Sequence, residues 1–301
     1  MPSTGEPESQ RGATPDIDRL AFAFIPEQAG ERMRVGLSSR LLVGGLGAGS
    51  AVARTVPDAT GHSLGRVWAR SIVRALDLTI DVSGLGNIEP GRTYLVAPLH
   101  ESFVDIPVLL QLPLDLRFTV RQELVGHDVI GPVLHRTDQI VVPEHPSVST
   151  LRTLMGEVAQ ATETGESVVV FPQGSVLGVE AAFSRGLITL SRTLDLPVLP
   201  VVLAGTHRVW GHPFDNVVRL HRTVAMHVLE PIPAAHIDAG RFRDLERSMK
   251  ELALAQTAAP VRRFEPDRDG WWDNYAYAID DDFPELTAAV ANHRAGVGDS
   301  S

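Results

Sequence analysis

The sequence predicts an α/β protein with a mostly parallel, seven-stranded sheet that is covered by helices and preceded by a basic helical region. Short apolar, β-favouring runs alternate with longer segments in which apolar residues recur every three or four positions. Strands that alternate with helices form parallel sheets with both faces covered. With 301 residues, of which 44% are hydrophobic, the chain can bury a substantial core.

The chain before the sheet divides into two parts. Residues 1–18 are rich in Pro, Gly, Ser and Thr, so we expect a disordered tail. Residues 19–77 are expected to form a basic amphipathic helical region, because residues 31–76 hold seven arginines against two acidic residues. Such a helix can lie on an anionic membrane with its apolar face inserted, or it can pack on the core with its arginines in solvent.

The α/β core is expected at residues 78–235. Its seven strands are predicted at residues 78–82, 93–97, 116–120, 139–142, 167–171, 198–203 and 223–229, with helices between several of them, as at 147–162 and 186–194. Residues 236–301 are expected to form a C-terminal helix and an aromatic tail that packs on the core. The aromatic cluster at 271–277 is alternatively a second membrane anchor or a wall of an acyl pocket.

Composition excludes several classes of protein. The absence of cysteine rules out disulfides, thiolate metal sites and a cysteine nucleophile, and no metal ion is expected, since the histidines lack ligand spacing. A net charge of −10 argues against nucleic acid as a partner. No apolar run is long enough to span a bilayer, and residues 1–7 lack the features of a secretory signal. We therefore expect a cytoplasmic protein, peripheral on the inner face of the membrane.

The most informative segment is Leu-His-Glu-Ser-Phe-Val-Asp at residues 99–105, whose last residue is predicted to begin a helix. His100 follows an apolar strand, and Asp105 begins a helix that has Pro107 in its first turn. We expect the Asp105 carboxylate to hold the His100 imidazole. A histidine held in this way can act as a general base, taking a proton from a hydroxyl or amine as that group attacks an acyl carbonyl. His100 and Asp105 are therefore the predicted catalytic residues.

Two later segments are also apolar runs that end in Pro and Gly, Val-Val-Val-Phe-Pro-Gln-Gly-Ser at 168–175 and Leu-Pro-Val-Leu-Pro-Val-Val-Leu-Ala-Gly at 196–205. With His100 and Asp105 as His-x4-Asp, these ordered blocks resemble the glycerolipid acyltransferase family typified by 1-acylglycerol-3-phosphate acyltransferases. That family continues with Phe-Pro-Glu-Gly-Thr-Arg and Val-Pro-Val. The resemblance runs from about Tyr94 to Trp210 and implies a glycerol-3-phosphate acyltransferase-like fold.

The resemblance implies transfer of a fatty acyl group from acyl-CoA or acyl carrier protein to a lipid hydroxyl, with no cofactor beyond that co-substrate. The first acceptor it suggests is 1-acyl-sn-glycerol-3-phosphate, as in phospholipid biosynthesis. The residues expected to bind substrate are Phe171, Pro172, Gln173, Gly174, Ser175, Arg185 and Pro200. Backbone N–H groups near this turn are expected to stabilise the developing oxyanion.

Two departures from the family pattern concern the acceptor. Gln173 replaces the family's Glu, and Val176 replaces an Arg that is thought to bind the acceptor's phosphate in relatives, a contact that Val cannot make. Three arginines nearby in the sequence remain candidates for that contact: Arg121, Arg136 and Arg185. A phosphate-free hydroxyl acceptor is thus an alternative, as is a catalytically silent, membrane-associated lipid-binding module. A serine hydrolase is a minor alternative, because Gly-x-Ser-x-Gly is absent around Ser175.

Overall fold

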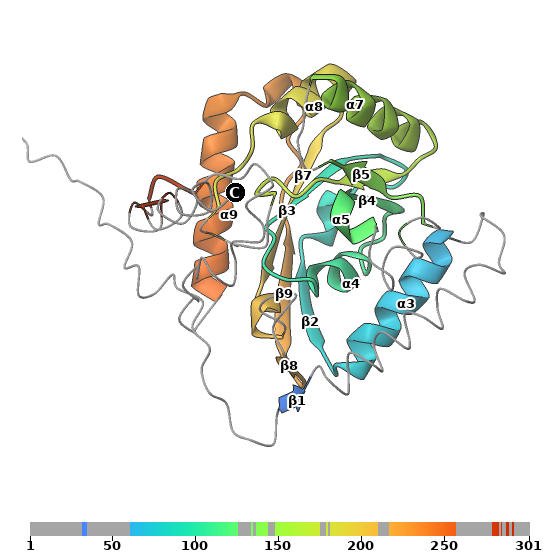
Figure 1. The fold of residues 1–301 in the computed structure, drawn as a ribbon, viewed down its shortest axis with the longest axis vertical. Coiled ribbons are helices and arrows are strands. Elements are labelled where there is room, and N and C mark those ends of the chain that lie inside the picture. The colour runs from blue at the N-terminus through green and yellow to red at the C-terminus, as the bar shows by residue number, and fades with distance from the viewer. Residues whose placement is uncertain are drawn as a thin grey trace, which may run out of the picture.

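The computed structural model describes residues 32–34, 61–125, 134, 137–143, 148–174, 179, 181–209, 217–256 and 279–282, together with 284, 287, 288 and 291. Several predictions fall outside these ranges: the disordered tail at 1–18, Arg136, Ser175, Val176 and the aromatic cluster at 271–277. The described chain forms a large sheet with helices on both sides (Figure 1).

The large sheet contains all seven strands that the sequence predicts. They are β2 (Thr79–Ser83), β3 (Leu95–Pro98), β4 (Leu116–Arg121), β5 (Ile140–Val142), β6 (Ser167–Val169), β7 (Val198–Ala204) and β9 (Thr223–Val228). Their order is β2-β9-β7-β3-β6-β4-β5, and each neighbouring pair is parallel except β7 and β9. The mostly parallel α/β fold is therefore confirmed.

A second, two-stranded sheet was not expected. Strand β1 (Arg32–Arg34) pairs antiparallel with β8 (Val217–Arg219), although the sequence predicts helix around residue 33 and no strand at 217–219. Pairing between segments so far apart in the chain leaves no local periodicity to read, and strand formation depends strongly on such context. The basic region is helical at α3 (Gly61–Ala75), where apolar residues recur at helical spacing.

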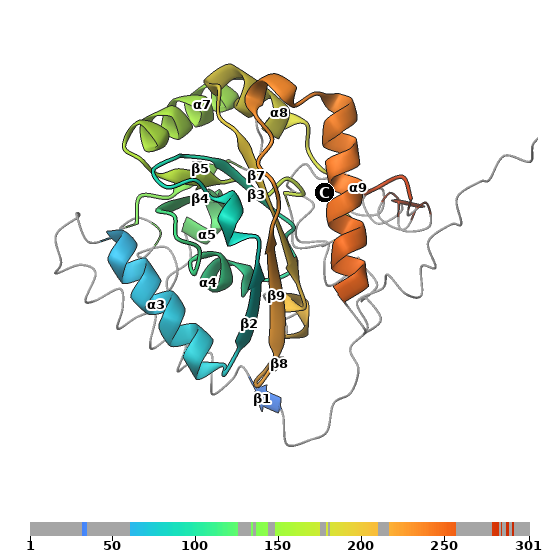
Figure 2. The same cartoon turned by 180° about the vertical axis from the view of Figure 1, so that it is seen from behind.

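Helices cover both faces of the large sheet. Besides α3, the helices are α4 (Asp105–Leu109), α5 (Gln122–Val125), α7 (Val148–Glu163), α8 (Gly186–Leu194) and α9 (Ala239–Gln256), with 3₁₀ turns η2 (Leu85–Asn87), η4 (Thr206–Arg208) and η5 (Ala234–His236). Figures 1 and 2 show α9 and α3 on opposite sides of the sheet. Helices α7, α8 and α9 contribute to one hydrophobic cluster, and α3 and α4 contribute to the other.

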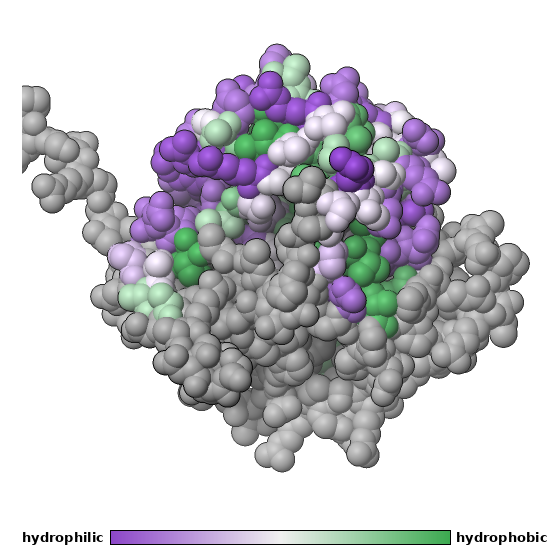
Figure 3. All heavy atoms as spheres, turned by 45° about the horizontal axis from the view of Figure 1, so that its top comes forward, coloured by the Kyte–Doolittle hydropathy of each residue, from purple (hydrophilic) through white to green (hydrophobic). Residues whose placement is uncertain are grey.

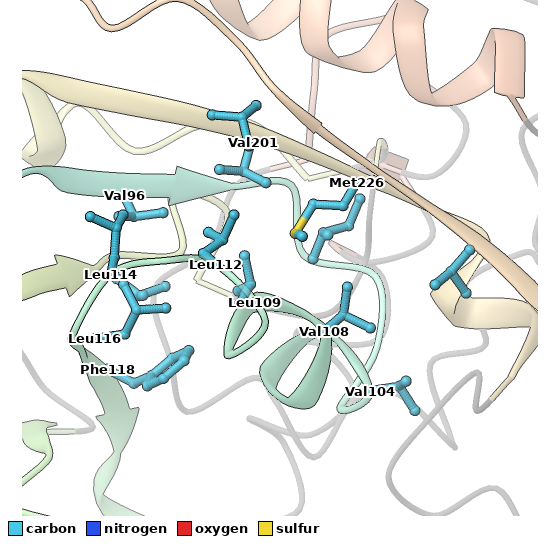
Figure 4. Packing of buried hydrophobic residues seen from close by; sticks show 14 of the residues in the cluster. Val96, Val104, Val108, Leu109, Leu112, Leu114, Leu116, Phe118, Val201 and Met226 are labelled. Atoms are coloured by element: carbon cyan, nitrogen blue, oxygen red, sulfur yellow. The ribbon is translucent and has the colours of Figure 1, made fainter. Parts of the chain in front are cut away.

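The pleat of the strands separates these two clusters. In β3, Leu95 and Ala97 belong to the cluster with α7, α8 and α9, whereas Val96 between them belongs to the cluster with α4. Figure 4 shows Leu109 of α4 beneath the strands that carry Val201 and Met226. Because both faces of the central strands β3 and β7 are buried, polar groups that act on a substrate there have to come from the loops at the ends of these strands.

The apolar side of α3 packs on the core. Ala69 is buried and Ile72 and Val73 pack on the hydrophobic cluster. Arg70, Arg74 and Val67, which is 58% exposed, lie on the outer side of the helix. Core packing, one of the two predicted uses of this helix, is therefore observed, while contact of its outer side with a membrane stays a prediction. None of the helices within the described ranges has the length and hydropathy that crossing a bilayer requires. Among the residues coloured by hydropathy in Figure 3, hydrophilic ones predominate, with apolar residues in patches between them.

Candidate active site

The predicted catalytic pair lies at the carboxyl edge of the large sheet. Strand β3 ends at Pro98 and α4 begins at Asp105, as expected, so His100 occupies the loop between them. Its Nδ1 lies 2.7 Å from the Oδ2 of Asp105. Asp105 is fully buried, whereas 14% of the His100 side chain is exposed. The imidazole therefore reaches the surface while the carboxylate behind it is shielded from water.

Three donors converge on one oxygen of Asp105. Besides the imidazole, the backbone N–H groups of Glu101 and Ser102 donate to Oδ2, at N···O distances of 2.7 and 2.9 Å. These bonds hold the carboxylate in one place and one orientation. Since Nδ1 faces a carboxylate, it is the ring nitrogen that donates, which leaves Nε2 of His100 as the proton acceptor.

The imidazole is also held against an aromatic ring. Phe171, two residues beyond the end of β6, stacks on His100 with a centroid distance of 3.9 Å and an interplanar angle of 25°. Phe118 of β4 lies next to Phe171, with ring centroids 6.5 Å apart. Stacking on one side and the carboxylate at the ring edge together fix the direction in which Nε2 points.

Gln173 connects the turn after β6 to the loop that carries His100. Its Oε1 accepts a hydrogen bond from the backbone N–H of His100 at 3.0 Å, and the residue is 1% exposed. An amide oxygen can accept this bond as a carboxylate oxygen would, so the replacement of the family's Glu preserves the acceptor. The turn itself is closed by the N–H of Gly174, which donates to the carbonyl of Phe171. That N–H is therefore engaged within the turn, and an oxyanion would need other donors.

The other predicted site residues are spread more widely. Arg185 is exposed at the start of α8, and Pro172 is buried in the turn. Pro200 is buried in the middle of β7, opposite Ala97, and thus inside the sheet rather than at its edge. The β7–β9 pairing begins only at Val201, so a residue without an N–H is tolerated there. The structure brings His100, Asp105, Phe171 and Gln173 together.

A second carboxylate–imidazole contact lies beside the first and was not predicted. Oε2 of Glu101 is 2.8 Å from Nδ1 of His207, and both residues are buried, at 2% and 8% exposure. His207 follows the end of β7 in the same way that His100 follows β3. The rule that drew attention to His100, a polar residue directly after a buried parallel strand, also applies to His207 and was the available signal.

Comparison with known proteins shows similarity to acyltransferases. Residues 79–204 match the family model described as Acyltransferase. The chain is 26% identical over 243 residues to the chloroplastic 1-acyl-sn-glycerol-3-phosphate acyltransferase BAT2 of Brassica napus, an alignment covering 73% of this chain and 69% of that protein. It is 25% identical over 259 residues to the lyso-ornithine lipid O-acyltransferase of Pseudomonas aeruginosa, covering 77% of this chain and 97% of that protein.

A solved structure shares the fold. The crystal structure of the 1-acyl-sn-glycerophosphate (LPA) acyltransferase PlsC from Thermotoga maritima superposes with a TM-score of 0.53 at 18% identity. The similarity covers 73% of this chain and 90% of that chain. At this identity the match supports the architecture of the sheet and its helices, and it carries no inference about substrates.

Proposed function

Because residues 79–204 match the Acyltransferase family model and similar proteins are named as lipid acyltransferases, we propose that the chain moves a fatty acyl group from a thioester donor to the hydroxyl of a lysolipid. The observation that carries this proposal is the 2.7 Å contact between His100 and the buried Asp105. It supplies an oriented base at the edge of the sheet where two neighbouring loops meet. Acyl-CoA and acyl carrier protein are the donors proposed.

The proposed reaction needs no covalent enzyme intermediate. Nε2 of His100 takes the proton of the acceptor hydroxyl as its oxygen forms a bond to the thioester carbonyl carbon. The resulting tetrahedral oxyanion collapses, the carbon–sulfur bond breaks, and the imidazolium returns the proton to the thiolate. Because a thioester is already activated, positioning and base catalysis of about 10²–10⁴-fold account for turnover. Asp105 stabilises the imidazolium and holds the ring in place.

The first acceptor proposed is 1-acyl-sn-glycerol-3-phosphate, the substrate in the name of the Brassica napus relative. A phosphate needs a cation near His100. Arg121 is the half-buried last residue of β4, the strand beside β6, and so lies at the same edge of the sheet as the base. Of the predicted phosphate contacts it is the best placed, because Arg185 is exposed at the start of α8.

A phosphate-free acceptor is the second candidate. Two observations favour it: Val176 stands where relatives have an arginine, and the relative from Pseudomonas aeruginosa, aligned over 97% of its length, is named a lyso-ornithine lipid O-acyltransferase. Under this alternative the same base acts on a hydroxyl of a lipid that has no phosphate, so its head group does not bind Arg121.

An acceptor panel separates these possibilities. Thiol release from a long-chain acyl-CoA, and separately from the matching acyl carrier protein thioester, is measured with lysophosphatidate, its dephosphorylated monoacylglycerol and lyso-ornithine lipid. The main proposal expects lysophosphatidate to have the highest kcat/KM, and Arg121→Met to raise its KM without changing the KM of monoacylglycerol. Preference for lyso-ornithine lipid supports the second candidate. Absence of turnover with every acceptor and both donors contradicts catalysis and favours a lipid-binding module.

Peripheral contact with an anionic membrane, on its cytoplasmic face, is proposed through the outer side of α3. Arg70 and Arg74 are exposed there, whereas Arg66 is bonded to Asp115 and to the carbonyl of Leu114. Two exposed arginines add roughly 2 kcal/mol of attraction to anionic lipid. In sedimentation with phosphatidylglycerol vesicles, Arg70→Gln combined with Arg74→Gln should weaken binding roughly thirtyfold. Equal binding of both proteins, or equal binding to neutral vesicles, contradicts this contact.

A further inference from the structure

The carboxylate of Glu101 joins two loops at the carboxyl edge of the sheet. Glu101 belongs to the loop after β3, and its Oε2 accepts hydrogen bonds from the loop after β7. The donors are the backbone N–H of Gly205 at 3.2 Å, the hydroxyl of Thr206 at 3.4 Å and Nδ1 of His207 at 2.8 Å. One buried oxygen therefore gathers three donors from three consecutive residues.

The loop after β7 is shaped to present these donors. Gly205 has a φ of 89°, in the left-handed region that favours glycine, and the 3₁₀ turn η4 begins directly after it. A Cβ at this position would lie 3.4 Å from the carbonyl oxygen of Thr223, an ordinary contact, so it is the backbone conformation that favours glycine here. The turn thus depends on a residue without a side chain, and it directs an N–H, a hydroxyl and an imidazole to one oxygen.

Glu101 is also tied to the catalytic pair through its own backbone. Its N–H donates to Oδ2 of Asp105 at 2.7 Å, the same oxygen that holds Nδ1 of His100. A displacement of Glu101 would therefore move a donor of Asp105 and the residue next to the base. A buried carboxylate is costly unless it is fully paired, so an apolar residue would serve packing alone at lower cost.

We propose that Glu101, held by His207, is a positioning residue for acyl transfer, an inference that rests on the proposed function. On the β6 side, Gln173 holds the backbone N–H of His100. On the β7 side, the loop after that strand holds the side chain of Glu101, which is the residue next to His100. The loop with the base is thereby restrained from both neighbouring strands, and a displacement of about 1 Å in such a loop can cost on the order of 10² in rate.

Steady-state kinetics of Glu101→Leu, Glu101→Gln and His207→Ala test this role, with turnover expressed per folded molecule. Glu101→Leu should lower kcat roughly 10- to 100-fold and leave both KM values within about twofold. Glu101→Gln keeps an oxygen acceptor and should recover most of the lost rate. His207→Ala leaves Glu101 two donors and should lower kcat less than Glu101→Leu does. Glu230→Leu, at an exposed position after β9, is the matched control and should be unchanged.

Coupling between the two residues sharpens the test. If Glu101 and His207 act through one contact, the double variant should lose less rate than the product of the two single losses. Unchanged kcat in both Glu101→Leu and His207→Ala overturns the proposal, and so does a rise in KM at constant kcat. If Glu101→Leu does not fold, His207→Ala and Glu101→Gln carry the same comparison.

Proton NMR keeps this inference separable from the proposed function. The Nδ1 proton of His100, bonded to a buried carboxylate, should give a downfield resonance that is identified by its loss in His100→Ala. It should broaden or disappear in Glu101→Leu and persist in Glu101→Gln. An unchanged signal in Glu101→Leu overturns the positioning role even if no acceptor supports turnover. If the signal is lost in Glu101→Leu but the wild type turns over no acceptor, the positioning role stands and only the acyl-transfer assignment is contradicted.

Discussion

Gln173 holds the backbone N–H of His100, with its Oε1 3.0 Å from that nitrogen across 73 positions of sequence. The bond links the Phe-Pro-Gln-Gly turn to the loop with the proposed base, so these two blocks form one unit in the structure. It also gives a physical reason why Gln is compatible with a position where the family has Glu. What the contact requires is an acceptor oxygen, and both side chains have one.

The first prediction concerns this acceptor. Gln173→Leu should lower kcat roughly tenfold or more and destabilise the fold by about 1–3 kcal/mol, because the His100 N–H loses its partner in a buried place. Gln173→Glu offers a carboxylate oxygen to the same N–H and should retain more activity than the leucine variant. Initial rates and urea denaturation check both expectations. Equal activity in the wild type and the leucine variant would show that the bond has no part in positioning.

The second prediction concerns the ring that stacks on the base. Phe171→Ala removes the surface on which the His100 imidazole lies at 3.9 Å, so the ring gains freedom and kcat should fall. Phe171 is half-buried, and its truncation should cost no more than about 3 kcal/mol of stability. Phe171→Leu keeps apolar cover and should lose less. A fall in kcat that merely follows the folded fraction, measured by circular dichroism, contradicts the positioning role of this ring.

The third prediction concerns a buried cation on α9. Lys250 is 8% exposed and bonds to Oε1 of Glu246 at 2.7 Å and to Asp280. Glu246 also accepts the backbone N–H of Phe183, which follows the Phe-Pro-Gln-Gly turn. Lys250→Met leaves two carboxylates without their cation and should destabilise the protein by about 3 kcal/mol.

Urea denaturation measures this loss directly. Arg247→Met on the same helix is the matched control, since its side chain is 68% exposed and lies 3.9 Å from Asp244. The control should change stability by less than about 1 kcal/mol. Similar losses in the two variants would show that the buried cluster contributes no more than a surface pair.

Much of the fold could be predicted because its signals are local. Several strands of the large sheet, such as β3 and β7, are short apolar runs, β4 alternates apolar and polar residues, and α3 and α7 carry apolar residues at helical spacing. The β1–β8 pair could not be predicted, because antiparallel pairing between remote segments leaves no periodic trace. Strand β6 ends at Val169, before the expected residue 171, as Phe171 leaves the sheet to stack on His100.

The part of the site that could be predicted lies within one segment, where the residue types and the spacing between them together indicate a catalytic pair. His100 and Asp105 lie five residues apart, and one strand-to-helix turn brings them into contact. The contact between Glu101 and His207 spans 106 positions and depends on β7 lying next to β3, an order that no single segment encodes. His207 follows a buried strand, which was a signal in the sequence, but only the assembled sheet shows that its partner is Glu101.

The central claim is that His100 is the general base of acyl transfer, and its most direct test is thiol release from acyl-CoA by wild type and His100→Ala at saturating acceptor. Loss of the base should lower kcat by about 10²–10⁴-fold, while the melting temperature stays close to that of the wild type. His236→Ala, at an exposed position in η5, is the matched control and should keep full activity. Wild-type turnover by a folded His100→Ala protein would contradict the account.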